Sequence, residues 1–195
     1  MRPNVSPNRR RASRARLPGP RVEDRRSWPP RDDGVVFDTV LGLPAHPLFV
    51  HGAVVLLPLM ALISAIVAWR PPWWPRLAAP VAAANALVLV LVWVAKESGE
   101  KLEHRVDRTP AVHEHAELGD LLPLAAFVLL ACSLVPAYLA WRARRDRTTS
   151  AVLAPRGLAL ATAVVTTLVA LGVLILTLQV GHTGAVAVWG DVIKA

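Results

Sequence analysis

Charged side chains are absent from four long stretches of this 195-residue chain, and cysteine occurs only once. The single cysteine, Cys132, excludes an internal disulfide, a four-thiolate iron–sulfur centre and covalent c-type haem attachment, which requires a C-x-x-C-H sequence. The chain also lacks the H-E-x-x-H pattern of zinc proteases, the E-x-x-H pattern of di-iron bundles and a glycine-rich phosphate loop. No candidate catalytic residue emerges, so we do not expect a stand-alone enzyme.

The four uncharged stretches are apolar, and they cover residues 48–69, 77–95, 121–141 and 157–180. An α-helix rises about 1.5 Å per residue and the hydrocarbon core of a bilayer is roughly 30 Å thick, so each stretch is long enough to cross it. We therefore predict an all-α fold, an integral membrane four-helix bundle with the bilayer as its main partner. The absence of ionisable groups at depth disfavours a pump or an ion-coupled transporter.

Residues 1–34 differ in composition from the rest of the chain, with ten arginines, four acids and six prolines. Such a segment cannot bury enough apolar surface to order itself, which predicts a disordered basic tail before a membrane domain at residues 35–195. A second interpretation is that the segment is translated upstream sequence and that the true start lies near Val35. In either case the tail carries most of the net charge of +8, so nucleic acid is not expected as a partner.

All six histidines are predicted to lie on one face of the membrane, because each falls where a span begins or ends on the same side. The loops on the opposite side are short and rich in arginine, which the positive-inside rule places in the cytoplasm. We therefore expect a multi-pass protein of the bacterial cytoplasmic membrane with its histidines on the extracytoplasmic face. The arginine-rich tail adjoins the histidine side and would itself prefer the cytoplasm, and this conflict disappears if the tail is translated upstream sequence. The histidines are His46, His51, His104, His113, His115 and His182.

The entry to the third span has a recognisable helix start. Thr109 followed by Pro110 is a favourable beginning, so the span should start outside the membrane and run through residues 113–119 without a break. Gly119 lies one turn deeper than His115, which leaves room for a flat ligand near the backbone. His113 is expected to form a solvated pair with Glu117, and Glu100 with His104.

The fourth span is predicted to end in the sequence Gly181 to Ala185, where two glycines permit a turn that could aim His182 back at the bundle. Polar residues within the spans are expected to form hydrogen bonds between helices. Five tryptophans near the span ends are expected to form an interfacial belt. They are Trp69, Trp73, Trp74, Trp93 and Trp141.

Three interpretations of the histidines remain open. His51, His115 and His182, with Gly119, could bind b-type haem for electron transfer, and a redox partner protein would then be expected. Zinc or copper could instead bind to His46, His51, His115 and His182. In the third interpretation no cofactor binds, and the histidines cap helices in a structural or interaction module.

Three motifs resemble those of a bacterial family of four-span membrane proteins that is classed as a domain of unknown function. They are a G-L-P-A-H-P-L-x-V-H opening at Gly42 to His51, an H-A-E-L-G entry to span three at His115 to Gly119, and a G-H-x-G-A close at Gly181 to Ala185. The resemblance covers roughly residues 35–193. It implies the fold and the membrane location, and it singles out His46, His51, His115 and His182, but it implies no activity.

Overall fold

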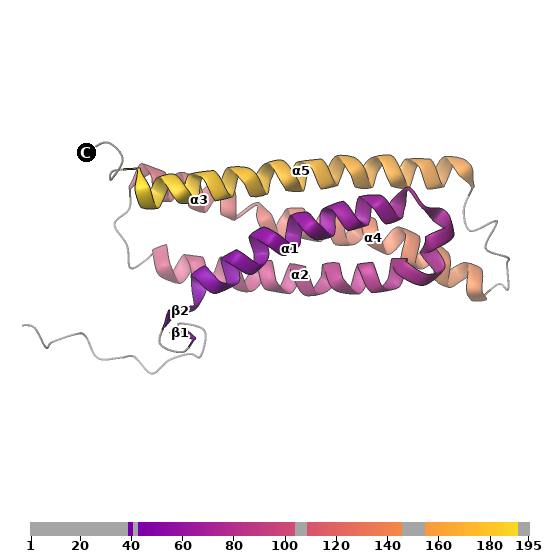
Figure 1. Ribbon diagram of the computed structural model, residues 1–195, viewed down its shortest axis with the longest axis horizontal. Coiled ribbons are helices and arrows are strands. Elements are labelled where there is room, and N and C mark those ends of the chain that lie inside the picture. The colour runs from indigo at the N-terminus through magenta and orange to yellow at the C-terminus, as the bar shows by residue number, and fades with distance from the viewer. Residues whose placement is uncertain (1–38, 41–42, 104–108, 146–154, 191–195) are drawn as a thin grey trace, which may run out of the picture. The chain divides into compact units, whose positions relative to one another are not determined.

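The described part of the chain is almost entirely helical. The computed structural model describes residues 39–40, 43–103, 109–145 and 155–190, all within the unit Val36–Ala195 (Figure 1). The predicted tail at residues 1–34 and His104 lie outside these residues. The helices are α1 (Ala45–Ala68), η2 (Pro71–Trp73, a 3-10 helix), α2 (Trp74–Glu103), α3 (Pro110–Gly119), α4 (Leu122–Arg145) and α5 (Arg156–Trp189). Two short antiparallel strands, β1 (Thr39–Val40) and β2 (Leu43–Pro44), precede them.

Four segments of the structure are long and apolar enough to cross a membrane, as predicted. They are Leu48–Ala68, Pro71–Glu100, Pro110–Arg145 and Arg156–Trp189. The long helices α1, α2, α4 and α5 pack in a ring, since α2 contacts α1 and α4, and α5 contacts α1 and α4. The predicted all-α four-helix bundle is therefore confirmed.

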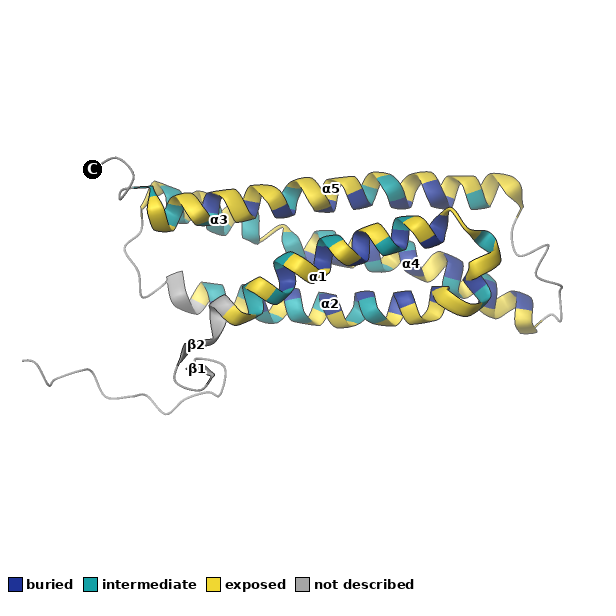
Figure 2. Cartoon of the chain, in the orientation of Figure 1, coloured by how far each residue is buried: buried dark blue, intermediate teal, exposed yellow. Residues whose placement is uncertain are grey.

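The bundle buries little of its apolar surface. In the most apolar 18 residues of each span, only 22–33% are buried inside the bundle. The buried residues form a narrow core that includes Leu57, Val92, Leu129 and Val173. Figure 2 shows exposed residues along the outer side of every long helix. Because so many large apolar side chains face outward, the surface suits lipid rather than water as the surrounding solvent.

The third span is interrupted, which the sequence analysis did not predict. The Thr109 side chain accepts a hydrogen bond from the Val112 amide at 3.3 Å and Pro110 begins α3, so the predicted helix start is confirmed. However, α3 ends at Gly119 and α4 begins at Leu122. Pro123 explains the break, because it has no N–H to donate to the Gly119 carbonyl and its ring crowds that oxygen.

The predicted helix turn at Gly181 to Ala185 is wrong. Helix α5 continues to Trp189, and the Gly190 amide closes it with a 2.8 Å hydrogen bond to the Val186 carbonyl. Gly181 and Gly184 therefore lie within the helix and make no turn. His182 is consequently held on the surface of a regular helix.

Polar side chains join the helices inside the apolar region. Asn85 of α2 is buried and donates from Nδ2 to Ser64 Oγ of α1 at 2.9 Å. Trp69, at the end of α1, donates from Nε1 to Thr167 Oγ1 of α5 at 2.9 Å. These two bonds confirm the prediction of hydrogen bonds between helices. The threonines of α5 also donate to carbonyl oxygens of their own helix, which satisfies their hydroxyls in lipid.

One member of the predicted tryptophan belt does not belong to it. Trp74 is fully buried, and its Nε1 donates to the Val67 carbonyl oxygen at 2.9 Å. Trp74 thus fixes the turn between α1 and α2 instead of facing the interface. Trp69, Trp73 and Trp141 are about half exposed, as a belt residue should be.

Candidate functional site

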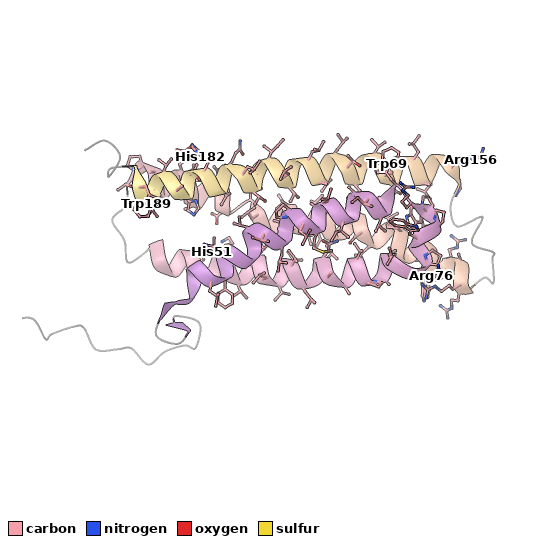
Figure 3. The ribbon with its side chains drawn as sticks, viewed as in Figure 1. His51, Trp69, Arg76, Arg156, His182 and Trp189 are labelled. Carbon is pink, nitrogen blue, oxygen red and sulfur yellow. The ribbon has the colours of Figure 1, made fainter. Side chains whose placement is uncertain are left out.

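The two ends of the bundle carry different side chains. His51, His182 and Trp189 lie toward one end and Trp69, Arg76 and Arg156 toward the other (Figure 3). We call these the histidine end, with His51, His113, His115 and His182, and the arginine end, with Arg70, Arg76, Arg142, Arg144, Arg145 and Arg156. The candidate site lies at the histidine end, along the seam where α3 packs against α5.

His115 of α3 is hydrogen-bonded to α5. Its Nδ1 lies 3.1 Å from the Val180 carbonyl oxygen and 3.3 Å from Thr183 Oγ1. A carbonyl oxygen only accepts, so Nδ1 must carry a hydrogen in this contact. In the neutral ring Nε2 is then the unprotonated nitrogen. Histidines that ligate metals or haem iron commonly have this arrangement, with one ring N–H held by a backbone carbonyl and the other nitrogen available.

Gly184 makes the close packing of His115 possible. A Cβ atom at position 184 would lie 3.0 Å from Cε1 and 3.2 Å from Nδ1 of His115. Gly181, one turn earlier on α5, has no atom within 4 Å of the corresponding position. The second glycine of the G-H-x-G-A motif therefore provides space for the imidazole ring and not a helix turn.

A small cavity of about 170 Å³, open to the surface on one side, lies on the same seam, and its residues Glu114 and His182 are exposed. Its walls are Ala111 and Glu114 of α3 with His182, Thr183 and Val186 of α5. A carboxylate and an imidazole on neighbouring helices thus line one space, and Thr183 joins this space to the hydrogen bond of His115. Both side-chain types are ligands of zinc and copper.

The predicted convergence of His51, His115 and His182 is only partly seen. His115 and His182 share the α3–α5 seam, whereas His51 is exposed on α1, where the adjacent Gly52 faces Leu91 of α2. His46 belongs to α1, but its side chain lies outside the described residues. In the described part of the chain, no three histidine, cysteine, aspartate or glutamate side chains are grouped to hold a metal ion.

The remaining predicted residues of this end serve other contacts or face open space. His113 Nε2 lies 3.3 Å from Glu117 Oε1 in an exposed pair, as predicted. At Gly119, a Cβ atom would have no neighbouring atom within 4 Å, so the space beside this glycine is open. Glu100 pairs with Lys96, and the predicted pair with His104 lies outside the described residues.

Two functional candidates were missed in the sequence analysis. Glu114 lies beside His115 and three residues after Ala111 on the helix, and the histidine pattern of the sequence does not single it out. Lys96 was assigned only to the connection after span two, but its Nζ lies 3.3 Å from Asp120 Oδ1 at the α3–α4 break. This ion pair links α2 to the break between α3 and α4.

Comparison with known proteins agrees with this architecture. Neither a curated protein nor a solved structure matches the chain. A family described as "Predicted membrane protein (DUF2231)" matches residues 42–195, which include all four apolar helices and all three motifs. The chain therefore belongs to the DUF2231 family of predicted membrane proteins.

Proposed function

We propose that this membrane protein binds one divalent transition-metal ion, zinc or copper, at its histidine end, with His182 and Glu114 as protein ligands. The observation that carries the proposal is the cavity on the α3–α5 seam, which has an imidazole and a carboxylate in its walls. Nitrogen and oxygen donors of these two types suit both ions.

The geometry favours an exchangeable site over a structural one. Structural zinc sites are closed by four protein ligands, whereas the cavity offers two side-chain ligands among the described residues. Water would complete the coordination, as in sites that load and release an ion or present it to a partner. The protein then acts as a membrane-embedded binding module and not as a stand-alone enzyme.

A b-type haem bound through His115 is the second candidate. It is favoured by the hydrogen bond from Nδ1 to the Val180 carbonyl, which directs the ligating lone pair to Nε2. Pockets for ligands of this size are commonly about 300–1,000 Å³. The cavity of about 170 Å³ is smaller, which is why we rank a single ion above haem. With haem, the protein would carry electrons to or from a redox partner.

The proposed orientation places the histidine end outside the cytoplasm. All six arginines of the described residues lie at the arginine end, and the positive-inside rule places this end in the cytoplasm of a bacterial cell. The metal site would then face the extracytoplasmic side of the cytoplasmic membrane.

The test uses the full chain purified in detergent with an affinity tag that contains no histidine. The protein is incubated with Zn²⁺ or Cu²⁺, dialysed, and analysed for bound metal by mass spectrometry. We expect about one ion per chain, and at least about tenfold weaker binding in His182→Ala and Glu114→Gln, because each removes one of two protein ligands. His113→Ala is the matched control, since His113 pairs with Glu117.

An absorbance spectrum of the same purified protein separates the two candidates. A reducible Soret band that is lost in His115→Ala would support haem and overturn the metal proposal. Neither a Soret band nor stoichiometric metal would overturn both candidates and leave a membrane module without a cofactor.

A further inference from the structure

Charge is separated between the two ends of the bundle. All acidic residues in the described part of the chain lie toward the histidine end, at Glu97, Glu100, Glu103, Glu114, Glu117 and Asp120. The six arginines of the described part lie at the arginine end and are all exposed. The arginine end thus presents an excess of positive charge with no acidic residue of the described chain beside it.

Contacts between neighbouring elements gather several of these arginines. Arg144, near the end of α4, donates from its guanidinium to the Pro75 carbonyl oxygen at the start of α2. The Arg70 guanidinium lies 5.7 Å from the centre of the Trp73 ring. These contacts hold the Arg70 and Arg144 guanidinium groups beside the short connection between α1 and α2.

Two of the arginines occupy positions that are electrostatically unfavourable within the protein. Arg76 lies in the first turn of α2, and Arg156 is the first residue of α5. The amino-terminal end of a helix carries a partial positive charge, so a cation there is repelled. An anion bound from outside would relieve this repulsion at both helices.

Aromatic side chains place the arginines at the level of lipid headgroups. Trp69, Trp73 and Trp141 are 51%, 45% and 52% exposed and lie at this end of the spans. The Arg145 guanidinium lies 5.0 Å from the centre of the Trp141 ring. Half-exposed tryptophans mark the membrane–water interface, where the phosphate groups of lipids are found.

We propose that the arginine end is a binding surface for the phosphate groups of anionic phospholipids. Arginine recognises phosphate through a planar, bidentate hydrogen-bonding group that remains charged. The flanking tryptophans favour a lipid over free phosphate, because they lie where acyl chains meet headgroups. This inference does not depend on the proposed metal site, which lies at the opposite end.

The test compares bound lipid by native mass spectrometry after reconstitution of the full chain in vesicles of mixed phosphatidylcholine and phosphatidylglycerol. We expect phosphatidylglycerol to be enriched on the protein. The variant R76Q/R145Q/R156Q should lose the enrichment, since each arginine near an anionic surface strengthens binding about fivefold. The charge-conserving variant R76K/R145K/R156K should retain part of it, because lysine keeps the positive charge but cannot form the bidentate contact.

A variant could lose the enrichment because it misfolds, so two further measurements use the unaltered protein. Salt raised from about 0.05 M to about 0.5 M should weaken the enrichment, because it screens exposed charges. At constant ionic strength, inorganic phosphate in place of chloride should leave the enrichment largely unchanged; full displacement by phosphate would identify a simple anion site and overturn the lipid proposal. Equal retention of the two lipids by the unaltered protein would also overturn it.

Discussion

His115 and Gly184 depend on each other in the structure. The imidazole ring fills the space that a side chain at position 184 would occupy, and its Nδ1 hydrogen is bound by the carbonyl oxygen of Val180. The contact fixes both the position and the tautomer of His115. A single methyl group therefore tests whether the seam is packed as described.

We predict that Gly184→Ala unfolds at a lower temperature than Gly181→Ala. Both substitutions replace glycine within α5 and gain similar helix propensity, about 1 kcal/mol. Only the methyl group at position 184 meets His115, at 3.0 Å, and such overpacking costs about 1–3 kcal/mol. Thermal unfolding in detergent, followed by tryptophan fluorescence, measures the difference. Equal unfolding temperatures would contradict the packing of the seam.

The hydrogen bond between Asn85 and Ser64 gives a second prediction for single residues. Asn85 is 2% exposed, and its Nδ2 donates to Ser64 Oγ across the α1–α2 contact. We expect a coupling energy of about 0.6 kcal/mol, and at most about 1.7 kcal/mol, which is the range for such bonds between membrane helices. The double-mutant cycle of Asn85→Ala and Ser64→Ala measures it. Additive effects of the two changes would show that the bond contributes no stability.

Residue types and spacing predicted some of these contacts but not others. The Thr109–Pro110 helix start and the His113–Glu117 pair follow from local spacing, and both are present. The contact of His115 with Val180 joins residues 65 positions apart. It depends on how α3 packs against α5, which local patterns do not encode. Whether His51 lies near the other histidines also depends on helix packing, so spacing in the sequence could not predict it.

Only one of the four prolines in the apolar spans coincides with a break between helices. Pro58, Pro80 and Pro136 lie inside α1, α2 and α4, which continue past them. Pro123 instead follows the break between α3 and α4, where Asp120 is bound by Lys96. Local sequence does not show which of these four prolines separates two helices, because each removes one backbone N–H and crowds one carbonyl in the same way.

We predict that Pro123→Ala joins α3 and α4 into a more continuous helix. Alanine restores an N–H that can donate to the Gly119 carbonyl, and proline within a helix costs about 3 kcal/mol. Hydrogen exchange of residues 119–124, measured by mass spectrometry, should become at least about tenfold slower. Pro136→Ala is the control, because α4 is already continuous there. Unchanged exchange in Pro123→Ala would assign the break to another cause.

The length of α5 was also not predicted from the sequence. The sequence analysis placed its end at Gly181 to Ala185, since glycine commonly ends helices in water-soluble proteins. In lipid, glycine within a helix instead permits close approach of a neighbouring helix. Gly184 has this second role toward α3. The apolar span lengths were predictable because hydrophobic thickness constrains them directly, whereas the role of a glycine depends on its neighbours.

At the scale of the whole molecule, the separation of arginines from acidic residues sets a direction along the bundle. The positive-inside rule disfavours translocating the six arginines of the arginine end, while acidic residues have little influence on orientation. The ten arginines of residues 1–34 precede the first span on the histidine side and oppose this orientation, unless they are translated upstream sequence. The same arrangement places the proposed lipid surface and the proposed metal site on opposite sides of the membrane. The orientation therefore determines which side of the membrane each proposed site faces.

We predict that the histidine end is accessible from outside a bacterial cell and the arginine end is not. Cys132, the only cysteine, is first replaced by serine, and a new cysteine is then introduced as Glu117→Cys or Arg76→Cys, both at exposed positions. A maleimide that does not cross membranes should label position 117 in intact spheroplasts and position 76 only after lysis. The reverse pattern would place the arginine end outside and contradict the orientation. Labelling of both positions in intact spheroplasts would show insertion in two directions and would also contradict the prediction.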